Sequence, residues 1–193
     1  MGRTRQFDAA QALDQAMEVF WQKGYADTSM NDLVQATGVS RYGIYGTFGN
    51  KRELFLAALD RYAQMTAGVK MRALRQPDAS LPEIKGYFRD MLRLNRSNWA
   101  DMGCMICNTA IEVAPQDEEI EAAVQGYLTM LTVIFSKALK NAKANGEIPA
   151  DTDHRRMGRY LTGQLMGLVV FVRSGMAKKD IKAYAESVID SLG

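Results

Sequence analysis

The sequence predicts an all-α protein of about nine helices. Proline is scarce, with four residues in 193, and all four lie outside the long stretches of helical periodicity. No stretch of alternating apolar and polar residues between turn signals indicates a strand. A hydrophobic content of 47% and a mean hydropathy of -0.22 are ordinary for a globular protein, and the chain is long enough to bury a substantial core.

Cap and stop signals place the helices along the chain. A Ser, Thr, Asp or Asn side chain can accept hydrogen bonds from the N–H groups of a first helical turn, and Gly or Pro ends a helix. Caps of this kind are Asp8, Thr28 or Ser29, Ser40, Asn50, Ser80 and Asp117, and stops are Gly24, Gly38, Pro115 and Gly146. The expected helices cover about residues 8–24, 29–36, 40–48, 50–74, 82–98, 104–113, 117–146, 153–174 and 178–191.

The segment VSRYGIYGTFGNK, residues 39–51, carries glycines at 43, 46 and 49. Each interior helical glycine costs roughly 1 kcal/mol relative to alanine, so this helix needs a reason to lack side chains. Two short helices joined by a tight turn at Gly38 have the spacing of a helix-turn-helix, whose second helix enters the major groove of DNA. Ile44 and Phe48 can pack on the first of these helices. On the opposite face, Gly43 and Gly46 would let the backbone approach DNA closely.

Side chains around this face suit DNA contacts. Ser40 and Lys51, near helix N-termini, can reach phosphates. Arg41 can donate two hydrogen bonds to guanine, and Tyr42 can contact a thymine methyl group or a phosphate. Net charge gives no such indication, because it is only +2 and the first 52 residues hold six cations and five acids. The prediction of DNA binding therefore depends on where the charges lie.

Residues 20–55, FWQKGYADTSMNDLVQATGVSRYGIYGTFGNKRELF, resemble the TetR family of one-component bacterial transcriptional regulators. The resemblance implies a helix-turn-helix DNA-binding domain at residues 1–50 and a ligand-binding and dimerisation domain at residues 51–193. Tyr42 and Gly46 depart from residues common in the family, so the operator sequence does not follow from the resemblance. The positions that it implies as DNA contacts are Thr28, Ser29, Arg41, Tyr42, Gly43, Tyr45, Thr47 and Lys51.

The C-terminal part is expected to hold a small-molecule effector. Its methionines are flexible apolar side chains that suit an adaptable pocket, although ordinary core packing explains each of them as well. Asn108 and Gln164 are polar at interior positions and need a partner, either a ligand or a backbone carbonyl. Segments that resemble the walls of the family's pocket carry the candidate ligand residues Met65, Met91, Trp99, Met102, Cys104, Asn108, Tyr127, Met130 and Gln164.

The two cysteines, Cys104 and Cys107, lie at the expected start of a helix. The helix dipole lowers the pKa of a thiol there, and the spacing permits a disulfide, so a redox-sensing or electrophile-sensing regulator is one alternative. Buried structural cysteines are the other alternative. With His154 far along the chain, a four-ligand zinc site is incomplete, and no metal or cofactor is expected. So few cysteines favour a reducing, cytoplasmic location.

The segment RYLTGQLMGLVVFVR is apolar on too many sides for a surface helix. Glycines at 163 and 167 would allow another helix to approach closely, and the resemblance implies that the last two helices form a four-helix bundle with a partner subunit. A homodimer would present two recognition helices to a pseudo-palindromic operator. The expected interface residues are Gly163, Met166, Gly167, Val170, Tyr184 and Val188.

The function expected from these features is a ligand-responsive transcriptional regulator, most simply a repressor that a small, largely apolar molecule releases from its operator. A thiol oxidoreductase using CMIC lacks a preceding strand and a nearby base, so no enzyme is expected. A ligand-sequestering protein is a third alternative. The longest apolar run, residues 165–172, is far shorter than the roughly 20 residues of a membrane span, and the first residues match no secretory signal.

Overall fold

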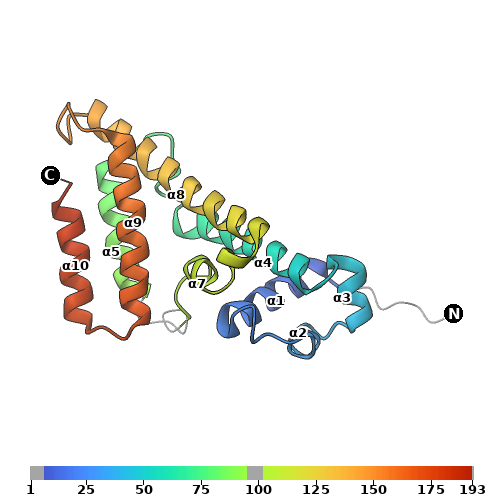
Figure 1. Cartoon of the computed structure of the whole chain (residues 1–193). Coiled ribbons are helices and arrows are strands. Elements are labelled where there is room, and N and C mark those ends of the chain that lie inside the picture. The colour runs from blue at the N-terminus through green and yellow to red at the C-terminus, as the bar shows by residue number, and fades with distance from the viewer. Residues whose placement is uncertain (1–6, 95–101, 193) are drawn as a thin grey trace. The chain divides into compact units, whose positions relative to one another are not determined.

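The computed structural model describes residues 7–94 and 102–192, which contain nine α-helices and no strand (Figure 1). The predicted all-α class is therefore confirmed. The α-helices are α1 (Ala9–Lys23), α2 (Met30–Thr37), α3 (Arg41–Phe48), α4 (Lys51–Met65), α5 (Leu81–Leu94), α7 (Met105–Glu112), α8 (Glu118–Ala144), α9 (His154–Arg173) and α10 (Lys178–Asp190).

The predicted caps act where the sequence places them. The Asp8 carboxylate accepts from the N–H groups of Ala10 and Gln11, and Ser40 accepts from Gly43 N–H at 3.1 Å. The second helix is capped by Ser29, whose hydroxyl accepts from Asp32 N–H while the Asp32 carboxylate accepts from Ser29 N–H. These contacts span three residues or fewer, which is why the local sequence predicts them.

The prediction of one α-helix from residue 50 to about residue 74 is wrong at its C-terminal end. The α-helix ends at Met65, and a π-helix, η1 (Thr66–Lys70), follows. In it the N–H of Met71 donates to the carbonyl of Thr66, five residues back, at 3.1 Å. A π-helix widens the turn and changes the direction of the side chains that follow. No cap or proline in the sequence indicates this change.

The chain divides into two compact units, one of residues Met1–Gln64 with Asn108–Val124 and one of residues Met65–Cys107 with Gln125–Gly193. This division differs from the expected domain boundary after residue 50, because helix α4 and the segment Asn108–Val124 belong with the first three helices. The boundary of the DNA-binding function itself stays a prediction. The two groupings are named here the N-terminal unit and the C-terminal unit.

An aromatic core holds the N-terminal unit together. Helix α1 packs on α2, and α2 on α3. The Phe20 and Phe55 rings lie 5.0 Å apart, and those of Trp21 and Tyr62 lie 4.9 Å apart, both edge to face. All four side chains are buried. Edge-to-face pairs of this kind stabilise beyond the area that they bury, so α1 and α4 form a firm base for the two short helices.

The C-terminal unit is a bundle in which α10 packs against both α5 and α9 (Figure 1). Helices α8 and α9 approach closely at Gly158, where an added Cβ would lie 2.2 Å from Ser136 Oγ and 3.0 Å from the carbonyl oxygen of Thr132. The hydroxyls of Thr132 and Thr162 meet at 3.0 Å beside this crossing. Glycine is therefore needed at position 158 for α9 to lie against α8.

Of the described helices, α8 alone is long and apolar enough to pass a test for a membrane span by length and composition. Its Leu131, Phe135 and Leu139 side chains are fully buried within the protein, and 39% of its most apolar window is buried. A helix in a protein core passes the same test. The buried side chains Leu131, Phe135 and Leu139 account for part of the apolar character of α8, and a single helix of this kind is weak evidence for a membrane span.

Candidate DNA-binding surface and effector site

Helix α3 has one face in the core and one in solvent. Ile44 is 1% exposed and holds the helix on the N-terminal unit. Tyr42 is 85% exposed and Tyr45 is 44% exposed, and Arg41 and Thr47 are exposed as well. Arginine, tyrosine and threonine side chains of this kind can contact phosphates and base edges. The predicted arrangement of a packing face and an open face is thus present.

Arg41 is held in place from the preceding helix. Its guanidinium donates to the side-chain oxygen of Asn31 on α2 at 2.9 Å. The remaining donors of the guanidinium point from an exposed side chain, in the fork geometry that suits the edge of guanine. Asn31 therefore orients the residue that is predicted to read a base.

The two glycines of α3 have different surroundings. An added Cβ at Gly46 would meet nothing within 4 Å, which fits the predicted clearance on an open face. An added Cβ at Gly43 would lie 2.8 Å from Val39 Cγ1 and 3.6 Å from the Phe7 ring. Gly43 thus lets the start of α3 pack within its own chain, and the predicted clearance for DNA does not account for it.

Thr28 does not have the open position that a phosphate contact needs. It is 1% exposed, and its hydroxyl donates to the Gly24 carbonyl at 2.6 Å. Its side chain fixes the turn before α2. Ser29, next to it, is exposed at the N-terminus of α2, but its N–H and hydroxyl both donate to the Asp32 carboxylate, so a phosphate contact there would have to replace these bonds.

Lys51 lies at the N-terminus of α4 beside the loop between α1 and α2. Its ammonium group sits 4.5 Å from the centre of the Tyr25 ring, and 3.4 Å from the Ala26 carbonyl oxygen. A cation over an aromatic face is held weakly enough to exchange partners. Lys51 is half-buried, so its stem is ordered while its charge stays near the surface.

Asp32, which closes the capping box of α2, also pairs with Lys23 on α1 at 2.6 Å. The Lys23 ammonium group, and then the Ser29 hydroxyl and N–H, hold the pKa of the Asp32 carboxyl well below its usual range. The carboxylate is thus ionised at neutral pH. It ties the first two helices together next to the exposed face.

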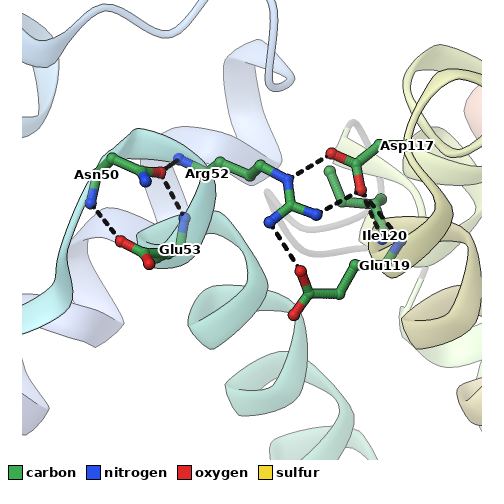
Figure 2. Close-up of polar contacts among 6 residues, drawn as sticks. All are labelled: Asn50, Arg52, Glu53, Asp117, Glu119 and Ile120. Atoms are coloured by element: carbon green, nitrogen blue, oxygen red, sulfur yellow. Dashed lines mark hydrogen bonds and ion pairs between the residues drawn. The ribbon is translucent and has the colours of Figure 1, made fainter.

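Asp117 and Glu119, which follow α7 in the sequence, bind the Arg52 side chain of α4 (Figure 2). The Arg52 guanidinium donates to both carboxylate oxygens of Asp117, at 2.5 and 2.8 Å, and pairs with Glu119 at 2.7 Å. Asp117 also accepts from the N–H groups at the start of α8, including that of Ile120 at 3.1 Å. One carboxylate therefore caps α8 and binds α4.

Glu112 makes a second link within the N-terminal unit. Its carboxylate accepts from the N–H groups of Tyr25 at 3.2 Å and Ala26 at 2.7 Å, in the loop between α1 and α2. The same carboxylate lies against Gly24, where an added Cβ would be 2.7 Å away. Gly24 has a φ of +83°, so glycine is required there for both reasons.

The candidate effector residues are only partly brought together. Cys104 and Tyr127 are buried, and burial, together with the nearby Cys104 thiol, raises the pKa of the Tyr127 phenol. Met65, Met91, Met102 and Met130 are half-buried. Asn108 belongs to the N-terminal unit rather than to the unit that holds the others, and Trp99 lies outside the described residues.

Gln164 has a partner within its own subunit. Its side-chain oxygen accepts from the Tyr184 hydroxyl, which links α9 to α10. The interpretation that a polar interior residue needs a partner is therefore correct, and the partner is another side chain of the same chain. Gln164 needs no ligand to satisfy this oxygen.

The two cysteines form a close pair in the C-terminal unit. The hydrogen bond with Cys104, together with burial, raises the pKa of the Cys107 thiol, and its sulfur lies 3.2 Å from that of Met166. The expectation of a lowered thiol pKa is wrong for Cys107, because burial and its neighbour outweigh the helix dipole. Among the described residues, no group of three or more His, Cys, Asp and Glu side chains could hold a metal ion.

Polar residues that the sequence analysis missed lie near Cys104. Lys70 on the π-helix and Tyr87 on α5 both interact electrostatically with the Cys104 thiol, and Thr66 neighbours Tyr127. The only sequence signal is a threonine and a lysine four residues apart in a segment expected to be helical. That signal does not distinguish a buried lysine from an exposed one.

The predicted dimer residues divide into two groups. Gly163 and Val170 on α9 are exposed, and nothing lies within 4 Å of an added Cβ at Gly163. Gly167 instead makes room for the Tyr184 hydroxyl of its own chain, which would lie 2.8 Å from an added Cβ. Val188 is 2% exposed, so it packs in the core of its own subunit and is not available to a partner.

Comparisons with known proteins agree with this geometry. Residues 12–58 match the family model described as bacterial regulatory proteins, tetR family, and residues 80–186 match the tetracyclin repressor-like C-terminal domain. The chain belongs to the TetR family. The chain is 33% identical over 174 residues, 90% of each protein, to the uncharacterized regulator YezE of Bacillus subtilis. It is 30% identical to the repressor ComR of Escherichia coli over 97% of this chain and 90% of that one.

Solved TetR-family structures share the whole fold. A cysteine variant of the regulator CifR, complexed with 26-base-pair operator DNA, aligns with a TM-score of 0.87 and 25% identity over 99% of this chain and all of that one. This TetR-family protein is a DNA-binding transcriptional regulator with a helix-turn-helix, and its relatives are regulators rather than enzymes.

Proposed function

We propose that the protein is a ligand-responsive repressor that binds a pseudo-palindromic operator as a homodimer. The observation that carries this proposal is the exposed face of α3, where Arg41, Tyr42 and Tyr45 lie in solvent opposite the buried Ile44. Such a face suits direct readout of bases in the major groove. The relative ComR, a repressor by name, supports the direction of the regulation.

In this proposal two subunits pair through α9, whose exposed Tyr160, Gly163 and Val170 share one side of the helix at intervals of three and seven residues. A two-fold dimer places two α3 helices on successive turns of one face of DNA. The operator lies in the cytoplasm with the bacterial genome, which is where the protein would act.

A small, largely apolar molecule bound in the C-terminal unit would favour the conformation with the lower operator affinity. Linkage requires that the operator then lower the affinity for this effector by the same factor. A coupling of tenfold to a hundredfold corresponds to about 1.4 to 2.7 kcal/mol. The chain runs without a break from α4 into the π-helix, where the N-terminal unit ends and the C-terminal unit begins. This covalent connection could transmit the effect of effector binding to the DNA-binding helices.

The test is a selection of genomic fragments bound by the purified protein, followed by titration of the selected duplex. We expect a specific duplex whose affinity falls steeply with salt, and we expect Arg41→Ala and Lys51→Ala to weaken it. Arg89→Ala, which removes an exposed arginine of α5, is the matched control and should bind like the wild type. Enrichment of no duplex over bulk genomic DNA would overturn the proposal.

Regulation through the thiols of Cys104 and Cys107 is the second candidate, and their close contact favours it. The raised pKa of Cys107 argues against regulation through this thiol, because the thiolate is the reactive form and a raised pKa leaves less of it at neutral pH. If diamide releases the operator from the wild type but not from Cys104→Ser, the thiols carry the response. If a ligand binds without any operator being found, the protein sequesters that ligand.

A further inference from the structure

Asn31 on α2 and Arg41 on α3 bind each other across the turn that joins the two short helices. Nη2 of the Arg41 guanidinium donates to the side-chain oxygen of Asn31 at 2.9 Å, and both side chains are exposed. The contact joins residues ten positions apart, so it is made by the packing of the two helices and not by a local motif. The inference drawn from it rests on the proposed function, because it concerns how the operator is read.

The group that holds Arg41 is uncharged. Other cations of the N-terminal unit are held by carboxylates, as in the pairs Lys23 with Asp32, Arg52 with Asp117 and Arg61 with Asp14. Arg41 makes no such ion pair with any residue that the structure describes. A carboxylate would offset the charge of the guanidinium, whereas an amide oxygen accepts a hydrogen bond and leaves the charge in place. Arg41 is therefore held and still attracts the phosphates of DNA.

Asn31 and Asp32 are neighbours in the sequence with different partners. The Asp32 carboxylate closes the capping box of α2 with Ser29 and pairs with Lys23 on α1, so it stabilises the unit itself. The same carboxylate at position 31 would put a negative charge beside Arg41 on the face that is expected to meet DNA. The neutral amide at this position thus holds the arginine without repelling a phosphate.

The chemistry of the two side chains determines which base they suit. Arginine carries only N–H donors, so it is the oxygen of the Asn31 amide that must face it. Guanine presents two acceptors in the major groove, O6 and N7, whereas adenine presents one acceptor and an N–H₂ donor that arginine cannot bind. A guanidinium held by Asn31 can meet both acceptors of guanine. One that rotates freely can turn to a phosphate instead, and phosphates carry no sequence information.

We propose that Asn31 is a specificity-determining residue of operator binding, which positions Arg41 for guanine without cancelling its charge. It lies outside the set of contacts expected from the sequence, because it acts from α2 on a residue of α3. Without this amide, Arg41 remains a cation near the DNA. The protein then keeps the electrostatic part of its affinity and loses its preference for guanine.

The experiment measures the affinity of the full-length chain for the selected duplex and for copies in which single G·C pairs are replaced by A·T. Arg41→Ala identifies the base pair that Arg41 reads, since replacing that pair no longer matters in this variant. The wild type should prefer guanine there by about tenfold or more. Asn31→Ala should lower that preference to about threefold or less and leave the dependence of affinity on salt unchanged, because the charge of Arg41 remains.

Asn31→Asp tests the need for a neutral partner. Aspartate keeps the size of the side chain and an acceptor for Arg41, so the preference for guanine should survive. Affinity for every duplex should fall about tenfold or more, and the salt slope should decrease by about one, because the carboxylate offsets the guanidinium charge. Wild-type affinity in this variant, or a preference as low as that of Asn31→Ala, would contradict the proposed role.

Gln64→Ala is the matched control, because it also removes an exposed amide hydrogen bond, to Asp60 at 2.7 Å near the C-terminal end of α4. It should bind every duplex like the wild type, and the unfolding temperatures of all variants verify that they fold. In a chain that already carries Arg41→Ala, adding Asn31→Ala should change nothing further, since Asn31 acts through Arg41. A further loss would mean that Asn31 contacts the DNA itself, which overturns the inference.

The selection of a duplex distinguishes this inference from the proposed function. If no duplex is enriched, the proposed function fails and the inference fails with it. If a duplex is selected but Asn31→Ala keeps the wild-type preference for guanine, or weakens all copies equally, only the inference fails. It fails as well if Arg41→Ala abolishes the preference at no base pair.

Discussion

The open face of α3 in the N-terminal unit exposes polar and aromatic side chains, whereas the polar and aromatic side chains near the π-helix of the C-terminal unit are buried. On α3, Tyr42 is 85% exposed and Arg41 is exposed as well, while near the π-helix Thr66 is 3% exposed and Tyr127 is 6% exposed. A DNA duplex is too large to enter a protein, so it is bound by side chains on the surface. A small molecule gains affinity when its apolar surface is removed from water, so it is bound by side chains in the interior.

This difference predicts separable effects. Substitutions on the open face of α3 should change operator binding with little effect on folding, and substitutions in the C-terminal interior should change folding or ligand binding first. The tests below are ordered from the largest expected effect to the smallest.

Gly158→Ala should lower the free energy of unfolding by about 1 to 3 kcal/mol, because the new Cβ would overlap Ser136 and press on the backbone of α8. Gly126→Ala is the matched control, since an added Cβ there would meet nothing within 4 Å. It should stabilise the protein by up to about 1 kcal/mol, the gain in helix propensity. Urea denaturation measures both. Equal effects of the two substitutions would contradict the close approach of α8 and α9.

Gly46→Leu should keep the fold and weaken operator binding about tenfold or more, near 1.4 kcal/mol, because a side chain on the open face would hold the helix away from DNA. Fluorescence anisotropy with the selected duplex measures the loss. Gly43→Leu is the informative comparison, since its Cβ would press on Val39 and destabilise the fold itself. Normal operator binding by Gly46→Leu would show that the clearance argument is wrong.

Glu112→Ala should cost about 1 kcal/mol of stability, because two backbone N–H groups lose a charged acceptor but can turn to water. Hydrogen exchange at Tyr25 and Ala26 should speed up more than exchange in α5. Glu121→Ala, which removes an exposed carboxylate of α8, serves as the control. Unchanged exchange in the loop between α1 and α2 would rule out the Glu112 link.

The smallest effect concerns acid stability. Arg52, and then the N–H of Ile120, lower the pKa of Asp117 from 3.8 to about 2. The folded state then binds fewer protons than the unfolded state between about pH 4 and pH 2, so this contribution is complete above about pH 4 and is lost as the pH falls toward 2. Arg52→Met should flatten that dependence in urea denaturation. Arg89→Met is the control, and an unchanged pH slope in Arg52→Met would count against the ion pair.

Local signals in the sequence predicted most of the fold. The caps at Asp8, Ser29 and Ser40 are contacts within three residues, and the packing face of α3 follows from helical periodicity. The π-helix could not be predicted, because no residue in TAGVK forbids an α-helix and the choice is made by tertiary packing.

The candidate sites were predictable to a smaller extent. Exposure on α3 follows from its pattern of apolar residues, but the burial of Thr28 and the packing of Gly43 depend on neighbours outside the motif. In the C-terminal unit the pairing of Gln164 with Tyr184 joins two helices, and the approach of Lys70 to Cys104 joins residues 34 positions apart. Contacts of this kind are set by the fold as a whole.

Glu112, at the end of α7, binds the loop between α1 and α2. This contact determines which residues must be transferred together when the protein is recombined with a relative. A chimera cut after α4 would keep every residue of the helix-turn-helix and yet lose the acceptor for Tyr25 and Ala26, and the partner of Arg52 as well. The transferable module is therefore discontinuous in sequence. An engineered regulator that takes its operator preference from this chain should carry Glu112 and Asp117 along with residues 1–64.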